Sequence, residues 1–232
     1  MDYYEEQQPY QPYRPGLSRR ERRRRSRRRQ HRWTAMALAL LLLLGGMGYC
    51  LWRMTRPLPG EGVVLPDYVT ADLLPINRFS RPGIDLEEIN GVVLHYVGNP
   101  ATTAQANRNY FASLAEGQTE VFASSHFIVG LEGEVIQCVP LTEISYASND
   151  RNGDTIAIEV CHPDEAGQYA PATYQRVVEL TAFLCREFRL DPETEVIRHY
   201  DVTGKLCPRY YVENPQAWEQ LKADVAAAMA AE

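Results

Sequence analysis

The chain has 232 residues and a formal net charge of -6, with 24 Lys and Arg against 30 Asp and Glu. These charges are unevenly distributed, because residues 1–56 carry 13 Arg and four acidic residues, whereas residues 57–232 carry 11 basic and 26 acidic residues. A strongly acidic C-terminal part lacks the electrostatic footprint of a nucleic-acid-binding protein, so we expect no nucleic-acid partner.

The N-terminal tail, residues 1–32, is predicted to be a disordered, Arg-rich cytoplasmic segment. Its first thirteen residues, MDYYEEQQPYQPY, lack the aliphatic residues that a core needs. The run RRERRRRSRRRQHR follows them. Beside a membrane helix such a run typically contacts anionic membrane lipid and sets the orientation, and nucleic-acid binding is the alternative.

Residues 33–52 are predicted to form one transmembrane helix. The segment WTAMALALLLLLGGMGYCLW is uncharged over twenty residues, about the length that crosses a hydrocarbon core of ~30 Å. The Arg-rich flank precedes it, so the positive-inside rule predicts a single-pass protein of the cell membrane with a cytoplasmic N-terminus and an extracytoplasmic C-terminal domain. A cleaved signal peptide is the alternative, but its apolar core spans about 7–15 residues and ends at a small-residue site. We therefore favour an uncleaved signal anchor.

After the helix, residues 53–72 are predicted to be a linker and residues 73–232 one folded domain. The linker contains Pro57, Pro59, Gly60, Gly62 and Pro66 and shows little apolar periodicity. The remaining ~160 residues suit one domain with a single core.

Short apolar runs in this domain predict four strands, at residues 91–97, 125–130, 135–139 and 155–161. Glu132 and Gly133 suggest a hairpin turn between the second and the third.

Three segments of the domain are predicted to be helices. The first spans residues 102–115, with Thr102 or Thr103 as its cap and Ala106, Tyr110 and Leu114 on one apolar stripe. The second follows Pro171, where apolar residues recur at spacings of three and four, and the third begins at Asn214–Pro215. The fold class predicted is therefore α/β, a mixed central β-sheet flanked by helices and preceded by one transmembrane helix.

The run HYDVTGKLCP contains two residues, His199 and Cys207, that can share one zinc ion. Catalytic zinc takes three protein ligands and leaves its fourth position to water or substrate. The best third ligand is His95, which closes the strand-like run GVVLHY. The alternatives are a surface His199, a disulfide-bonded Cys207 and a core His95 that is hydrogen-bonded to a carbonyl.

A carboxylate in an apolar strand is the second unusual feature, because Glu159 lies in TIAIEVC. An ionised carboxylate in such a strand is costly unless it is paired or functional. A general base facing a zinc-bound water would explain it, and a strand-end Glu reaching solvent is the alternative.

Together these residues resemble a known family. His95 in VVLHY, Glu159 in IAIEVC, and His199, Lys205 and Cys207 in HYDVTGKLCP match in order the zinc-dependent N-acetylmuramoyl-L-alanine amidases of the phage-lysozyme and peptidoglycan-recognition-protein superfamily. The resemblance runs from about residue 73 to residue 225, with SSHFIVGLEGEVIQC as the second and third strands and NRFSRPG as the approach segment. The chain departs from many members in the loop SYASNDRNGD, which holds no His, and in having Ser instead of Tyr just before the His of SSHF.

This resemblance implies a hydrolase that cleaves the amide bond between N-acetylmuramic acid and L-alanine in peptidoglycan. It implies Zn²⁺ as the cofactor, held by His95, His199 and Cys207, with Glu159 as general base and Lys205 stabilising the oxyanion. Peptidoglycan would be the partner, and a monomer is favoured. A peptidoglycan-binding module without hydrolysis and a zinc peptidase acting on stem peptides are the alternatives.

Further residues are predicted with less specific signals. His126, Tyr96 and Asn77 are candidate substrate contacts, and His162 and Asp201 are candidates for orienting the ligands. Other aromatic residues could flank the cleft: Tyr200, Tyr210 and Tyr211. The four cysteines after the membrane segment allow either two disulfides or, with Cys207 on zinc, three buried thiols: Cys138, Cys161, Cys185 and Cys207.

Overall fold

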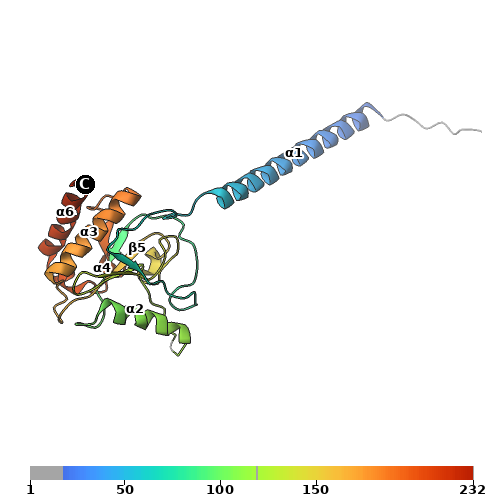
Figure 1. Cartoon of the computed structure of the whole chain (residues 1–232). Coiled ribbons are helices and arrows are strands. Elements are labelled where there is room, and N and C mark those ends of the chain that lie inside the picture. Colours follow the sequence, from blue (N-terminus) through green and yellow to red (C-terminus); the bar gives the residue numbers. More distant parts are fainter. Residues whose placement is uncertain (1–17, 119, 232) are drawn as a thin grey trace, which may run out of the picture. The chain divides into compact units, whose positions relative to one another are not determined.

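The computed structural model describes residues 18–118 and 120–231, which divide between Arg56 and Pro57 into two compact units. The N-terminal unit holds helix α1, Arg19–Thr55, and the C-terminal unit holds a sheet with its covering helices (Figure 1). Residues 1–17, the first part of the tail predicted to be disordered, lie outside the described residues, whereas residues 19–32 of that tail begin α1 and are helical, contrary to the prediction.

Helix α1 contains the whole of the predicted transmembrane segment. Within its stretch Arg23–Trp52, which is 30 residues long, an 18-residue window reaches a mean hydropathy of 2.0, so the helix is long and apolar enough to cross a membrane. Some signal sequences near an N-terminus are also long and apolar enough to meet this criterion, so anchoring by residues 33–52 stays a prediction.

Within residues 18–118 and 120–231, six strands form one mixed sheet in the order β1-β4-β3-β5-β2-β6, in which only the β3–β4 pairing is antiparallel. The predicted hairpin joins these two strands, and Gly133 occupies its turn with a φ of 81°. The predicted mixed α/β fold is confirmed, and each of the four predicted strands lies inside its expected segment. The strand bounds are Val69–Ala71 (β1), Val92–Leu94 (β2), Phe127–Val129 (β3), Val135–Gln137 (β4), Ile156–Val160 (β5) and Val196–Arg198 (β6).

Helices cover both faces of this sheet (Figure 1). Helices α3, Pro171–Phe188, and α6, Pro215–Ala230, pack on each other and share a core with Phe127 and Val129 of β3. Helix α2, Ala104–Ser113, shares a second core with Ile128, whose side chain points to the other face because side chains alternate along a strand. By the same alternation Ile158 and Val160 of β5 face α3, and Glu159 between them faces the side of α2.

Helix α2 begins as predicted but buries a different stripe. Thr103 is its cap, since the Thr103 side chain accepts a hydrogen bond from the Ala106 amide. Ala104 and Phe111 are buried, as is Leu114 of the predicted stripe, whereas Ala106 and Tyr110 of that stripe are exposed. The prediction was wrong for Ala106 and Tyr110 because a helix with small or aromatic residues on two faces does not reveal from its spacing which face meets the core.

The folded unit begins before Leu73, so residues 57–72 do not form a linker as predicted. Strand β1 pairs in parallel with β4, and the Asp72 amide donates to the Gln137 carbonyl over 3.1 Å. Partly buried side chains of this segment pack against the core, namely Val63, Leu65, Tyr68 and Val69. The segment buries single side chains between turns along the sheet edge, and this arrangement leaves no apolar period in the sequence.

Two glycines test this boundary. Gly60 and Gly62 both have a positive φ, 76° and 78°, but a Cβ at Gly60 would lie 2.7 Å from Leu141 Cβ, whereas one at Gly62 would meet nothing within 4 Å. We expect Gly62→Ala to lower the free energy of unfolding by about 1–2 kcal/mol through its backbone alone. Gly60→Ala should cost roughly 1–3 kcal/mol more because it forces the segment away from Leu141. Denaturant unfolding of both variants measures this, and equal losses would contradict packing of this segment on the domain.

Candidate active site

Three neighbouring strands in the order β5-β2-β6 bring the predicted residues together. Leu94 of β2 is in register with Ile158 of β5 and with Arg198 of β6, and both pairings are parallel. The next residue along each of these strands therefore lies beside the other two, at the edge formed by the carboxyl ends of the strands: His95, Glu159 and His199. The backbone amide of His95 continues the ladder by donating to the Ile158 carbonyl over 2.9 Å.

Cys207 reaches this edge through a tight loop. Helix α4, His199–Thr203, ends at Gly204, whose φ is 75°, and the Tyr200 amide donates to the Cys207 carbonyl over 2.9 Å. The loop thus folds back on the helix, as the predicted bend between His199 and Cys207 requires.

The three predicted ligands converge in a buried cluster. His95, His199 and Cys207 each offer a ligand atom, and these atoms all lie within 4.8 Å of one another. Cys207 Sγ lies 3.9 Å from His95 Nδ1, and the two imidazole rings are 4.6 Å apart between centroids. All five cysteines, each of which the structure describes, are free thiols, so the alternative of two disulfides is wrong.

The donors fit a divalent cation of the zinc type. Burial lowers the pKa of His95 well below its usual range, and burial also lowers the pKa of His199, so both rings are neutral and able to coordinate. Burial raises the pKa of the Cys207 thiol to about 12, which a bound cation would reverse. Two imidazoles and one thiolate with space on one side are the ligand set of a catalytic zinc site.

Glu159 lies beside the cluster in the position predicted for a base. Its Oε2 is completely enclosed and has no hydrogen-bond partner among the described residues. Burial raises the pKa of Glu159 to about 8, and the charge of Lys205 opposes this rise. A carboxyl whose pKa lies near neutrality can accept and release a proton at working pH.

A cleft of about 840 Å³ opens over the cluster. Lys205 is exposed at this cleft, and Tyr96 also lines it, as predicted for a substrate contact. The exposed face of α2 forms part of its wall through Ala106, Asn107 and Tyr110. Aromatic residues that the sequence did not single out complete the wall: Phe111, Phe122 and Tyr146.

Four other predicted residues serve the fold instead. His126 Nε2 lies 2.8 Å from the Glu143 carbonyl, while its Nδ1 accepts from the Ala157 amide, so both nitrogens are used inside the core. Asn77 Oδ1 accepts from the Phe79 and Ser80 amides in a turn. Neither His126 nor Asn77 lines the cleft, so the structure does not support the prediction that they contact substrate.

The two predicted orienting residues also bond elsewhere. His162 places both ring nitrogens on backbone carbonyls, those of Val97 and Asp164, at 2.8 and 2.7 Å. Asp201 accepts a hydrogen bond from the Arg198 amide and forms an ion pair with the Arg198 guanidinium. Together these contacts cap the start of α4, directly before His199. Neither side chain contacts a ligand through a hydrogen bond among the described residues.

The groups that do contact the ligand rings come from the loop before β5. Ser148 Oγ lies 3.2 Å from His95 Nε2, and Asn149 Oδ1 lies 3.0 Å from His199 Nε2. The sequence showed this loop only as a segment without a His. Its one signal is the Asn-rich run SNDRN, which is typical of turns with side-chain hydrogen bonds.

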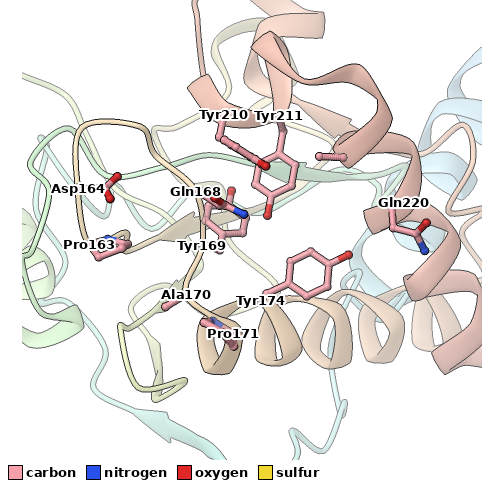
Figure 2. Close-up of a pocket in the computed structure, with 11 residues that line it drawn as sticks. Pro163, Asp164, Gln168, Tyr169, Ala170, Pro171, Tyr174, Tyr210, Tyr211 and Gln220 are labelled. Atoms are coloured by element: carbon pink, nitrogen blue, oxygen red, sulfur yellow. The ribbon is translucent and has the colours of Figure 1, made fainter.

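A second cavity, of about 630 Å³, lies between helices α3 and α6 and the loop that precedes α3 (Figure 2). Figure 2 shows Tyr174 on α3, Gln220 on α6, and Tyr210 and Tyr211 converging on it. Tyr210 and Tyr211 thus line this cavity and not the cleft over the ligand cluster. Tyr169 joins the two regions, because its hydroxyl donates to the His95 carbonyl over 3.1 Å.

Comparisons with known proteins agree with this arrangement. Residues 85–210 match the family model described as N-acetylmuramoyl-L-alanine amidase. The chain is 32% identical over 180 residues to the N-acetylmuramoyl-L-alanine amidase BlyA of Bacillus subtilis (strain 168). The aligned region covers 69% of this chain and 47% of that protein. It is 29% identical over 158 residues to the N-acetylmuramoyl-L-alanine amidase CwlL of Bacillus licheniformis, over 63% of this chain and 43% of the relative. The chain therefore spans about half the length of these curated relatives.

Solved structures share the fold. The catalytic domain of XlyA matches with a TM-score of 0.55 and 25% identity, over 68% of this chain and 98% of that one. A mutant endolysin from Bacillus subtilis matches with a TM-score of 0.56 and 24% identity, over 68% of this chain and 97% of that one.

Proposed function

Because the chain belongs to the N-acetylmuramoyl-L-alanine amidase family, we propose that it is a zinc hydrolase that cleaves the amide bond between N-acetylmuramic acid and L-alanine in peptidoglycan. The matched residues 85–210 include His95, Glu159, His199, Lys205 and Cys207. The convergence of two imidazoles and one thiol beside a buried carboxyl is the observation that carries the proposal.

His95, His199 and Cys207 would hold the ion. Bound there, Zn²⁺ supplies a Lewis acid that polarises the scissile carbonyl and makes a water molecule acidic near neutrality. Glu159 then takes the proton of the attacking water at its carboxylate and passes it to the departing amine of alanine. Lys205 stabilises the negative charge that develops on the carbonyl oxygen, because its ammonium is the cationic side chain exposed at this cleft.

The bond that is cut distinguishes this proposal from its alternatives. We expect the full chain, purified in detergent with about one zinc per molecule, to convert muropeptides into glycan fragments with a free lactyl carboxylate and stem peptides with a new N-terminal alanine. Mass spectrometry of the digest identifies both products. Release of internal stem fragments would favour a peptidase, and binding without any product would favour a peptidoglycan-binding module.

We propose further that α1 anchors the chain in the cell membrane, with residues 1–32 in the cytoplasm next to anionic lipid and the folded unit outside. The apolar stretch within α1 and the Arg-rich run before it support this orientation. The acidic charge of residues 57–232 fits a domain that faces away from the anionic cytoplasmic leaflet.

Protease accessibility tests the orientation. Protease added to intact spheroplasts is expected to digest the folded unit and to spare the Arg-rich tail, because only the former lies outside the membrane. Immunoblotting with tags at the two ends reads out both fragments. Protection of the C-terminal tag and loss of the N-terminal tag would show the reverse orientation.

A further inference from the structure

We propose that the turn Ser148–Asn149 is a positioning device that orients both imidazole ligands of the metal site from a single loop. The proposal rests on the zinc site of the proposed function and assigns to this loop the choice of the ring nitrogen that each histidine presents. Neither residue would touch the ion or the substrate's reacting atoms.

Asn149 determines the tautomer of His199. The Asn149 Oδ1 atom lies 3.0 Å from His199 Nε2. An amide oxygen accepts a hydrogen bond, so this contact is made when His199 carries its proton on Nε2. The lone pair of His199 is then on Nδ1, which is the nitrogen left for a cation.

Ser148 performs the same function for His95. His95 Nδ1 is the atom that faces Cys207 Sγ at 3.9 Å, and His95 Nε2 lies 3.2 Å from Ser148 Oγ. A hydroxyl can accept a hydrogen bond, so Ser148 accommodates a proton on Nε2 while Nδ1 stays available. Consecutive residues therefore present both histidines to the cluster through the same type of nitrogen.

The loop is held rigidly enough to do this. Asn152 Oδ1 accepts from the amides of Ala147 and Ser148, at 3.1 and 2.6 Å, and the Asn152 amide donates back to the Asn149 carbonyl over 3.1 Å. Asn149 itself has a φ of 52°, in the left-handed region that asparagine tolerates better than most residues. Ser148 is buried, with 1% of its surface exposed, so its hydroxyl is fixed beside the ring.

Partners of this kind are a substantial part of a metal site. They fix ring orientation and raise ligand basicity, and their removal typically costs 10–100-fold in metal affinity. In this chain, side-chain oxygens of two consecutive loop residues contact the two ligand rings.

Asn149 offers a matched pair of substitutions. Asn149→Gly removes the side-chain oxygen but adopts the positive φ freely, so the turn should survive. Asn149→Asp keeps an acceptor oxygen in the same position. In the full chain, we expect zinc affinity, measured by competition with a chelating dye, to fall by about 10–100-fold for Asn149→Gly and to be retained by Asn149→Asp. Ser148→Ala should weaken zinc binding, and Ser148→Thr, which keeps the hydroxyl, should restore it.

Two measurements on the metal-free chain separate positioning from folding and from the zinc site itself. The ¹⁵N spectrum of His199 should show the proton on Nε2 in the unsubstituted chain and a mixture of tautomers in Asn149→Gly, with an unchanged midpoint of thermal unfolding. Unaltered tautomers together with unaltered affinity in Asn149→Gly would overturn the proposal, as would a loss of affinity that Asn149→Asp fails to restore. If the unsubstituted chain showed the expected tautomer and bound no zinc, the proposed function would fail while the orientation of His199 by Asn149 stood.

Discussion

Replacing Glu159 by glutamine is expected to lower kcat by about 10²–10⁴-fold while zinc stays bound, because glutamine keeps the size of the side chain and loses its ability to transfer a proton. The carboxyl is enclosed beside the ligand cluster, and its raised pKa, about 8, suits proton exchange near neutrality. Hydrolysis of a defined muropeptide gives kcat, and elemental analysis of the same sample gives the zinc content.

A second glutamate serves as the control for this variant. Glu213 is exposed at the end of α5, Arg209–Glu213, and does not line the cleft. Glu213→Gln should leave kcat unchanged. A Glu159→Gln variant that kept full activity would remove Glu159 from the reaction, and one that lost zinc as well would show that its effect acts through the metal site.

Loss of the sulfur ligand should abolish both metal binding and hydrolysis. We expect Cys207→Ala to weaken zinc binding by more than the ~10–100-fold typical of groups that only support a ligand, because one of three direct donors disappears. Activity should fall in proportion to the zinc content, since the free ligand residues cannot polarise a carbonyl without the ion. Chelator competition and muropeptide hydrolysis, measured on one preparation, test the two effects together.

Cys185 provides the matched control for the sulfur. It is a fully buried free thiol on α3, within the core that α3 shares with the sheet and away from the cleft. Cys185→Ala therefore creates a comparable small void in the domain but should retain zinc and kcat. Equal loss of zinc in both variants would attribute the effect of Cys207→Ala to destabilisation of the fold.

The sequence identified the members of the buried cluster better than their arrangement. His95 and Glu159 stand out because a polar side chain in an apolar strand is costly, and His199 and Cys207 stand out because two zinc-type ligands share one short run. What brings the first three of them together is the order β5-β2-β6 and a common register. Strand β6 was not predicted, because its two apolar residues, Val196 and Ile197, lie between Glu195 and Arg198 and form no apolar run.

Buried histidines show the limit of residue-by-residue prediction. His95 and His126 both lie in or beside apolar strands, yet one faces the ligand cluster and the other bonds to the Glu143 carbonyl and the Ala157 amide. The difference depends on which backbone groups lie opposite each ring. The spacing of residues along a sequence does not reveal this. The contribution of Asn149 was missed for the same reason, since its oxygen meets a residue fifty positions away.

Helix α2 shows a related ambiguity. Its Ala106 and Tyr110 have the spacing of a core stripe, but they are exposed and line the cleft, whereas Ala104 is buried in the core and Phe111 is buried there while also reaching the cleft wall. A binding surface and a core surface both favour apolar side chains, so composition along the helix cannot separate them.

Two of the three proposed metal ligands directly follow strands of the sheet, and this position bears on the order in which the protein folds and binds its metal. His95 and His199 directly follow β2 and β6, whose parallel pairing is fixed by backbone hydrogen bonds and an apolar core rather than by an ion. Small zinc modules, by contrast, remain unfolded until the metal arrives. A chain of this kind would fold first and acquire its ion afterwards. Scarcity of zinc in its surroundings would then leave a dormant but intact stock of molecules that become active when the ion is supplied.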